Sequence, residues 1–413
     1  MSKNKYINRY GQHQIDNYDI KEVIKVLKSD FLTQGPFVEK FEKEFSKYVG
    51  SKEVVACSSG TAAIHLSLIA LGLKKDDFVI IPSVTFLSSA SCVKLLGGKI
   101  IFVDINPKTG LVEAENLLDV IIFAKKRRLL SRIKAFIPVH LNGQCADLSV
   151  IRKICLKYKI KIIEDSCHAL GTNYKPKNSK KTYSIGSCNF SDISTFSFHP
   201  VKVIAMGEGG AISLNNKKIA DNLRILRNHG ILKSKKLFKN KIKSQAVNNS
   251  NNQWYYEVQN LGFNYRVSDI SCALGLSQLK KINNFIKKRS LLVNLYNKKI
   301  LSLFPYIEVL HNHKFCKTSW HIYVVLINFK MLKISKSKFA YLLKKNNIGF
   351  QVHYVPLIYQ PVYKNEIMIN KYPGAKEYYF NAMTLPLSVN MSAKHVNFVF
   401  MILKKIIEKY KIN

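Results

Sequence analysis

The chain has 413 residues, 47% of them hydrophobic, which predicts a globular protein with a large buried core and more than one ordinary domain. No apolar run approaches the roughly 20 residues that span a bilayer, and the N-terminus lacks an apolar signal core, so we expect a cytoplasmic protein without a membrane segment. The net charge of +39 suggests nucleic-acid binding, but the lysines are spread along every segment, so no nucleic-acid partner is predicted.

Eight cysteines occur in the chain, and none forms a CxxC pair or matches a zinc-binding spacing. In a cytosolic chain such cysteines are expected to be free thiols that pack as small core residues. The sequence therefore predicts no metal site.

The first 50 residues have helical spacing in two stretches. Apolar residues recur at intervals of three and four over 19–27, and a second amphipathic stretch runs through Phe41 and Phe45. A Gly35-Pro36 breaker separates the two.

From about residue 53 to 215, short apolar strands alternate with helical stretches. This alternation is typical of an α/β fold with a mostly parallel sheet covered on both faces. The expected strands are 53–57, 78–81, 100–103, 134–139, 160–164, 193–198 and 210–213. Ligands of such sheets collect beyond the carboxyl ends of the strands, so Ser59, Asp165 and Lys202, each just past a strand, could share one site.

The remaining sequence predicts a long loop and a smaller second domain. Segment 231–256 is polar and reads as an extended loop or hairpin, and an apolar helix is expected from Ser268 to about Asn284. A long helix over 284–303 then leads to strands at 323–327 and 350–354 and helices at 335–345, 374–382 and 392–411. We predict a large domain over 1–285 and a small α/β domain over 286–413.

Lys202 follows an apolar strand, a proline and a short turn. A buried ammonium is costly unless it is neutralised or paired, and desolvation lowers the pKa of a lysine enough to free its amine. Such an amine can form a Schiff base with an aldehyde. The alternative is a surface lysine beside a tight turn.

Asp165 ends another apolar strand, and His168 follows three residues later. A carboxylate at that position can bond a protonated pyridine nitrogen, the partner that pyridoxal phosphate (PLP) needs to act as an electron sink. Asp165 could instead be a helix cap, and His168 could lie behind the site without touching a ligand.

The segment Ser59-Gly60-Thr61 lies between a strand and a helix. The free N–H groups and hydroxyls of such a helix start form an anion site suited to a cofactor phosphate. A phosphate turn, a carboxylate and a lysine, in that order in an α/β pattern, together indicate a PLP enzyme.

These motifs resemble the DegT/DnrJ/StrS family of PLP-dependent nucleotide-sugar aminotransferases. The matching segments spread over nearly the whole chain: 59–63, 164–171, 197–202, 207–210, 262–266 and 273–279. The resemblance implies the fold type I of PLP enzymes (aspartate-aminotransferase-like), a homodimer and aminotransfer to a sugar ketone, with Lys202 as the catalytic residue.

The resemblance also implies roles for single residues. Gly60, Thr61 and Ser197 are expected to hold the PLP phosphate, and Phe86 to stack on the pyridine ring. Asn264 is expected to reach the PLP phosphate of the other subunit, so that active sites are shared.

Two further cofactor roles follow from the same resemblance, those of Asp165 at the ring nitrogen and His168 at the ring hydroxyl. Phe86 could instead be a core side chain, and Ser197 a plain strand hydroxyl. His199 and Tyr354 are candidates for substrate contact, although packing explains both nearly as well.

Segment 349–363 looks like the C-terminal block of the UDP-4-amino-4,6-dideoxy-N-acetyl-β-L-altrosamine transaminases of pseudaminic acid biosynthesis (EC 2.6.1.92). That likeness implies transfer of an amino group, with glutamate as donor, to C4 of a UDP-linked 4-keto-6-deoxy-N-acetyl-hexose. The lysine-rich segments 174–183 and 231–256 leave a different 4-keto nucleotide sugar open.

Three alternatives from other classes are less well supported. A dehydratase of the same fold would carry a histidine in place of Lys202. A non-catalytic regulator on this fold would have lost Asp165 or Lys202. A nucleic-acid-binding module would depend on the net charge alone.

Overall fold

A seven-stranded sheet forms the centre of the computed structural model, which describes residues 9–177, 179–240, 252–367 and 372–411. The strand order is β1-β9-β8-β5-β4-β2-β3, and β9 runs antiparallel to its neighbours β1 and β8. The seven expected strands are all present, as β1 (Glu53–Cys57), β2 (Phe78–Pro82), β3 (Lys99–Val103), β4 (Ile133–Phe136), β5 (Lys161–Asp165), β8 (Ile193–Ser197) and β9 (Gly210–Leu214).

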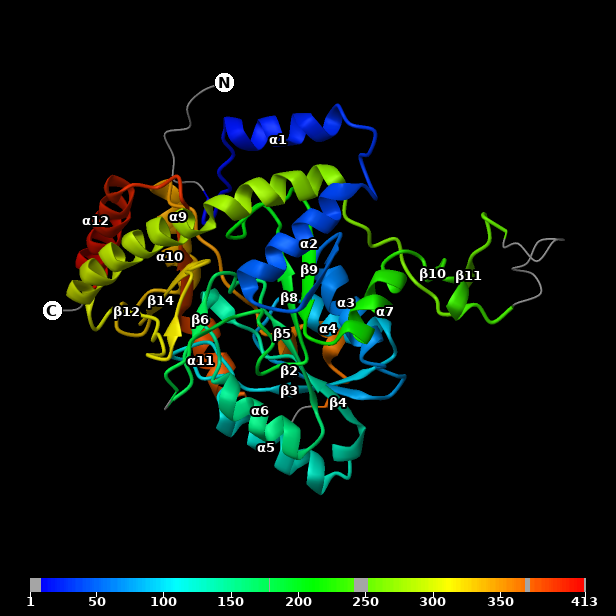
Figure 1. The fold of residues 1–413 in the computed structure, drawn as a ribbon. Coiled ribbons are helices and arrows are strands. Elements are labelled where there is room, and N and C mark those ends of the chain that lie inside the picture. The colour runs from blue at the N-terminus through cyan, green and yellow to red at the C-terminus, as the bar shows by residue number, and fades with distance from the viewer. Residues whose placement is uncertain (1–8, 178, 241–251, 368–371, 412–413) are drawn as a thin grey trace.

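Helices cover both faces of this sheet (Figure 1). The helices that precede β2 and β3 lie on one face of the sheet, and those that precede β4 and β5 lie on the other. This follows because crossovers between parallel strands are right-handed and the chain reverses its direction across the sheet after β3. The covering helices are α3 (Gly60–Ala70), α4 (Ser88–Leu95), α5 (Ala114–Lys126), α6 (Leu148–Lys157) and α7 (Lys217–Leu226). The strands between them are buried along nearly their whole length, as expected for a doubly covered sheet.

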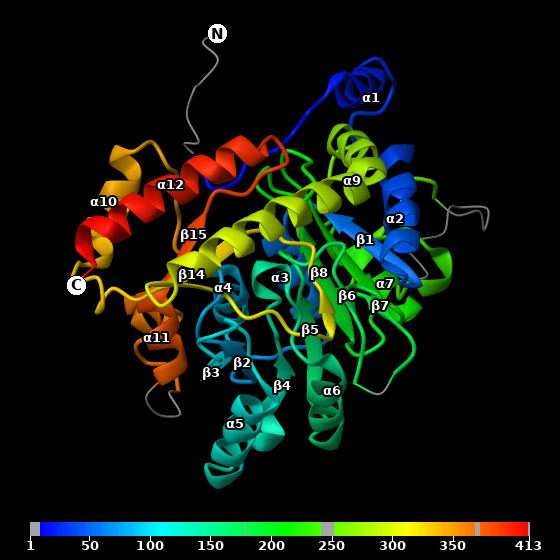
Figure 2. The same ribbon diagram turned by 90° about the vertical axis from the view of Figure 1, so that its left-hand side faces the viewer.

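A single long helix, α9 (Asp269–Ile300), links the two parts of the molecule. It packs against α1 (Asn17–Leu27) and α2 (Pro36–Val49) at one end and against α12 (Ala393–Tyr410) at the other (Figure 2). Ser268 caps it, since its hydroxyl accepts from the N–H of Ser271 at 3.1 Å. The two consecutive helices expected here are thus one, and the predicted domain boundary at 285/286 lies inside it.

The C-terminal part has its own core around a three-stranded antiparallel sheet, β12-β14-β15. Its elements are β12 (Ile307–Val309), β14 (Tyr323–Ile327), α10 (Lys336–Lys345), α11 (Pro373–Asn381), β15 (Ala382–Leu385) and α12. The strand predicted over 350–354 was wrong: only Gln351 forms a bridge, to Thr384, and the segment continues as an irregular wall. Its apolar and aromatic residues face the large domain instead of continuing the sheet.

Two small ribbons complete the fold. β6 (Asn173–Tyr174), β7 (Tyr183–Ser184) and β13 (Cys316–Lys317) form one sheet, so β13 attaches the C-terminal part to the large domain. β10 (Ile231–Leu232) and β11 (Glu257–Val258) form a ribbon that projects from the body of the molecule (Figure 1). An extended loop or hairpin was expected over 231–256, and the ribbon pairs residues at the two ends of this segment. Residues 241–251 lie outside the described residues.

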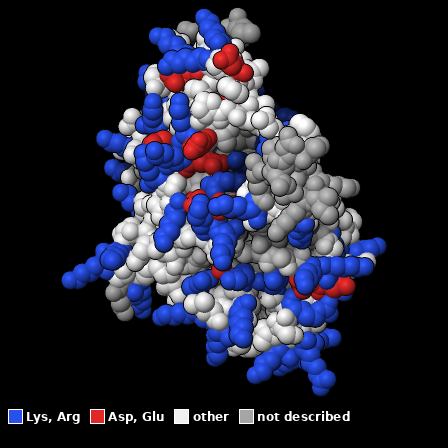
Figure 3. Space-filling model, turned by 45° about the vertical axis from the view of Figure 1, so that its right-hand side comes forward, with Lys and Arg blue, Asp and Glu red and all other residues white. Residues whose placement is uncertain are grey.

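Basic side chains are scattered over the face of the molecule drawn in Figure 3. On the face drawn in Figure 3, Lys and Arg occur from end to end, with a few Asp and Glu between them. Among the described residues, no helix is both long and apolar enough to cross a lipid bilayer.

Candidate active site

A cavity of about 670 Å³ opens at the carboxyl ends of β2, β5 and β8. Nine of the ten predicted site residues line it: Gly60, Thr61, Phe86, Asp165, His168, Ser197, His199, Lys202 and Tyr354. The tenth, Asn264, does not. A site built where parallel strands end was the expectation from the sequence, and the geometry places these residues together.

One end of the cavity is the N-terminus of α3. The Ser59 hydroxyl accepts from the N–H of Ala62 at 3.1 Å, which caps the helix and leaves its first N–H groups free to face a ligand. A Cβ on Gly60 would lie 2.8 Å from Cβ of Ser197, so only glycine lets the helix start approach the end of β8 this closely. The result is a polar cradle between a helix N-terminus and a strand end.

Asp165, the last residue of β5, is 5% exposed and lies in the floor of the cavity. Its carboxylate accepts from the Ser89 hydroxyl at 3.0 Å and from the N–H of Cys167 at 3.2 Å. No Lys, Arg or His of the described chain lies within ion-pair distance of it. A buried carboxylate with two neutral donors and no cation is suited to a cationic group on a ligand.

Lys202 reaches the same cavity from the loop that follows β8. Its backbone N–H donates to the carbonyl of His199 at 2.8 Å, so a tight turn presents the side chain. Burial lowers the pKa of the Lys202 amine. Cys167 and Asp165 act in the opposite direction, but the effect of burial is larger. The neutral, nucleophilic amine is therefore more populated at Lys202 than at an exposed lysine.

A group of buried histidines lies behind Lys202. His168 Nε2 pairs with the Tyr354 hydroxyl at 3.0 Å, and the His168 and His321 rings have centroids 4.3 Å apart. Burial, followed by the charge of Lys202, lowers the pKa of His168 and of His353. These rings are neutral at ordinary pH, and His168 retains an unpartnered buried Nδ1.

The wall opposite the sheet comes from residues 351–363. The Tyr363 hydroxyl pairs with the Ser91 hydroxyl at 3.0 Å, which ties this wall to α4. Tyr354 packs beside Phe86 with ring centroids 5.9 Å apart, and Phe86 remains 50% exposed at the cavity mouth. The half-exposed Phe86 is not a core residue and is available to a flat ligand.

Several residues in or next to the cavity were not predicted from the sequence. Ser89 supports Asp165 from 76 positions away, and His321 and His353 reach His168 from the C-terminal part. Tyr10 lines the cavity from the N-terminal segment. No local motif marks these residues, because their proximity arises only when distant segments pack.

Asn264, the tenth predicted site residue, and two other segments lie outside this cavity in the single chain. Asn264 is exposed and bridges Asn228, away from the cavity residues. In the loop between α1 and α2, the Gly35 N–H donates to the Asp269 carboxylate at 2.8 Å. Tyr359, within the 349–363 segment, packs edge-on against Tyr379 outside the cavity lining.

The residues present fit PLP. The cradle at the start of α3 suits a phosphate, and the unpaired Asp165 carboxylate suits a protonated ring nitrogen. The lowered pKa of Lys202 increases the share of neutral amine, the form that attaches to an aldehyde. The exposed face of Phe86 can cover a planar ring.

Comparison with known proteins identifies the family of the chain. Residues 13–404 match the DegT/DnrJ/EryC1/StrS aminotransferase family. A UDP-4-amino-4,6-dideoxy-N-acetyl-β-L-altrosamine transaminase of Campylobacter jejuni is 33% identical over 97% of this chain and 98% of its own. Helicobacter pylori PseC, an aminotransferase of pseudaminic acid biosynthesis, is 27% identical with a TM-score of 0.84, covering 97% of this chain and 99% of its own. The Streptococcus pneumoniae protein Spr1654, designated a sugar aminotransferase and solved in its PLP form, is 26% identical with a TM-score of 0.82, covering 98% and 99%.

Proposed function

Because the chain belongs to the DegT/DnrJ/EryC1/StrS family of PLP-dependent aminotransferases, we propose that it transfers an amino group from glutamate to C4 of a UDP-linked 4-keto-6-deoxy-N-acetyl-hexose. This is the reaction of pseudaminic acid biosynthesis (EC 2.6.1.92). The observation that carries the catalytic part is a lysine of lowered pKa and an unpaired buried carboxylate in one cavity, beside a free helix N-terminus.

Bound PLP supplies an aldehyde that accepts the amino group and a ring that withdraws electrons from the bond being broken. Lys202 would hold the cofactor covalently at rest. Once displaced by the amino donor, its amine would carry a proton between the donor's α-carbon and C4′ of the cofactor. The lowered pKa of Lys202 suits a group that must give and take a proton near neutral pH.

The other residues would fix the geometry of transfer. Asp165 would keep the ring nitrogen protonated, supported by its bonds from Ser89 and Cys167. Gly60 and Thr61 would hold the phosphate at the start of α3, together with Ser197. The neutral His168 would donate to or accept from the ring hydroxyl, and its bond to Tyr354 would set its orientation.

The sugar would occupy the space between the sheet and segment 351–363. His199 and Tyr354 line that space and offer polar groups to a hexose. The resemblance of this segment to the altrosamine transaminases, and the 33% identity to one of them, support the UDP sugar. A different 4-keto nucleotide sugar is the alternative, since the identity leaves room for changes in this wall.

The test is a spectrum of the purified protein loaded with PLP, taken before and after glutamate and then with each of several UDP-, GDP- and dTDP-4-keto sugars. We expect the visible cofactor band to fade with glutamate and to return with the UDP-linked 4-keto-6-deoxy-N-acetyl-hexose. Return of the band with another sugar alone would assign that sugar as the substrate. A band that does not change with glutamate would overturn glutamate as the amino donor.

The shared active site is a further part of the proposal. Asn264 is exposed outside its own cavity, which is consistent with a contact to a second subunit. Inactive Asn264→Ala and Lys202→Ala chains, unfolded and refolded together, should form mixed dimers with one intact site each, and so regain about a quarter of wild-type activity. No recovery, with dimers present by sedimentation, would assign both residues to sites within one chain.

A further inference from the structure

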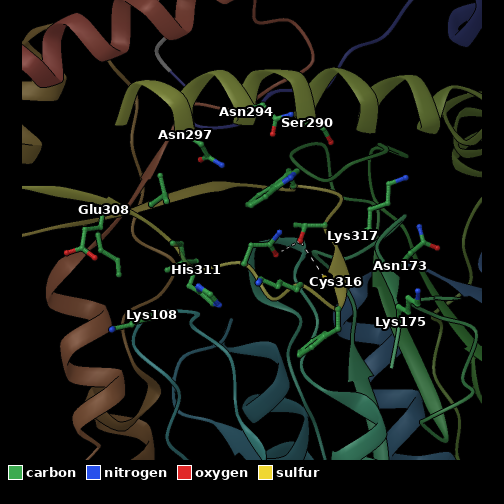
Figure 4. Close-up of a pocket in the computed structure, with 18 of the residues that line it drawn as sticks. Lys108, Asn173, Lys175, Ser290, Asn294, Asn297, Glu308, His311, Cys316 and Lys317 are labelled. Atoms are coloured by element: carbon green, nitrogen blue, oxygen red, sulfur yellow. Dashed lines mark hydrogen bonds between the residues drawn. The ribbon is translucent and has the colours of Figure 1, made fainter. Parts of the chain in front are cut away.

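A second cavity, of about 820 Å³, lies between α9, the strand β12 and the segment that leads to β13 (Figure 4). It shares no lining residue with the catalytic cavity. An adjoining hollow of about 580 Å³ continues along the same helix, and the residues common to both are Asn173, Ser290, Asn294, Lys317 and Thr318. We call the two together the α9 groove.

The helix side of the groove is a stripe of polar residues. Asn283, Lys287, Ser290, Asn294 and Asn297 recur at intervals of four and three, which places them on one face of α9. Figure 4 shows Ser290, Asn294 and Asn297 extending from the helix towards the cavity. Asn283, Lys287 and Asn294 are exposed and Ser290 and Asn297 are half-buried, so this side of α9 lies beside its buried face and offers polar groups to an occupant of the groove.

Hydrogen bonds orient two of the amides as donors. The Asn297 carbonyl oxygen accepts from the Tyr323 hydroxyl at 2.8 Å, and that of Asn312 accepts from the Thr318 hydroxyl at 2.7 Å. With these oxygens engaged, the NH₂ groups remain for a ligand in the groove. These two NH₂ groups call for acceptor atoms on the ligand.

Four lysines complete the lining of the larger cavity: Lys108, Lys175, Lys314 and Lys317. In the part of the chain that the structure describes, none of them lies within ion-pair distance of a carboxylate. Glu308 is the one acidic residue among the lining residues described. The groove therefore combines unpaired ammonium groups with amide donors, the same pairing that binds oxyanions elsewhere in proteins.

We propose that the α9 groove is a binding site for a small polyanion, whose phosphate or carboxylate oxygens accept from the lysines and from the amides of Asn297 and Asn312. The volume is that of a site for a metabolite-sized ligand. The proposal is separate from aminotransfer and does not depend on the substrate assigned to the catalytic cavity.

The test is calorimetric titration of the PLP-loaded enzyme with inorganic pyrophosphate and, separately, with citrate, which distinguishes a phosphate ligand from a carboxylate ligand. The variant Lys175→Gln/Lys317→Gln should weaken binding of the preferred anion by about tenfold or more, because two charge-assisted contacts are lost. The matched control Lys125→Gln/Lys126→Gln removes the same charge from the exposed end of α5 and should bind within about twofold of wild type, because it leaves the groove untouched.

Asn297→Asp tests the donor argument without a change of size. The carboxylate still accepts from the Tyr323 hydroxyl but presents an acceptor and a negative charge to the groove, so anion binding should fall while the unfolding midpoint is unchanged. Equal weakening in the lysine variant and its control would reduce the effect to overall surface charge and overturn the site. Unaltered binding in both groove variants, or no binding of either anion to the wild type, would overturn it as well.

Discussion

The two sides of the catalytic cavity are built in different ways. Asp165 and Ser197 end neighbouring parallel strands, so the hydrogen bonds of the sheet fix their relative positions. The facing wall, residues 351–363, has no regular strand and is held by side-chain contacts such as that of Tyr363 with Ser91. We infer that the residues for cofactor chemistry are positioned by the rigid sheet. The residues that select the sugar lie on a segment whose sequence can change without disturbing the sheet.

The largest expected effect is at Lys202 on the sheet side. Lys202→Ala should reduce turnover about 10⁴-fold, because both the covalent attachment and the proton carrier are lost. Formation of 2-oxoglutarate from glutamate measures the loss, and an unchanged unfolding midpoint shows that the fold is intact. Turnover within tenfold of wild type would remove Lys202 from the mechanism.

Asp165→Asn should come next, with about a 10³-fold loss in kcat, because an amide of the same shape cannot neutralise a protonated ring nitrogen. The hydrogen bonds from Ser89 and Cys167 hold the side chain at position 165, so its position should be retained in the variant. The cofactor should still bind, which its absorbance in the dialysed protein checks. An unaltered kcat would mean that the carboxylate charge is not used.

The opposite wall should respond differently. Tyr363→Phe removes the hydroxyl that pairs with Ser91 and should raise KM for the nucleotide sugar about tenfold through loss of one partly buried hydrogen bond. The glutamate half-reaction, followed by stopped-flow absorbance, should be unaffected.

Tyr359→Phe is the matched control, since Tyr359 lies in the same segment but outside the cavity lining. It should leave both half-reactions unchanged, because its hydroxyl does not face the cavity. If Tyr363→Phe slowed the glutamate step, the separation between the two sides of the cavity would fail.

The smallest effect concerns stability and pH. Burial lowers the pKa of His353 from 6.5 to about 3, so between these pH values the unfolded chain binds a proton that the folded chain does not. Folding therefore loses stability as the pH falls below about 6.5. His353→Gln should reduce the loss between pH 7 and pH 5 by about 2 kcal/mol, since one histidine contributes about 1.4 kcal/mol per pH unit.

Urea unfolding of the wild type and of His353→Gln at the two pH values measures this difference. Nδ1 of His353 is hydrogen-bonded to the Thr384 hydroxyl at 2.8 Å, a contact that the amide of glutamine can replace. Parallel losses in the two proteins would mean that His353 is protonated in the folded state at pH 5.

Most of the sheet side could be predicted, and most of the facing wall could not. Short apolar runs predict the strands, and polar residues at or shortly after the end of such a run lie near the carboxyl edge of the sheet, as Asp165 and Lys202 do. Segment 350–354 has the same apolar character, yet it forms a wall of the cavity because Gln351 alone pairs with the sheet. Its placement depends on packing against α4, which local pattern does not encode.

The sequence by itself determined the α/β class, the order of the seven strands along the chain, the family and the lysine, carboxylate and helix start of the site. These features follow from local periodicity and from residues close to strand ends. Only the tertiary structure decided that Ser89 supports Asp165, that His321 and His353 enclose His168, and that the polar stripe of α9 lines a cavity. Such contacts join residues separated by tens to hundreds of positions, and they exist only after the chain has buried its apolar surfaces against one another.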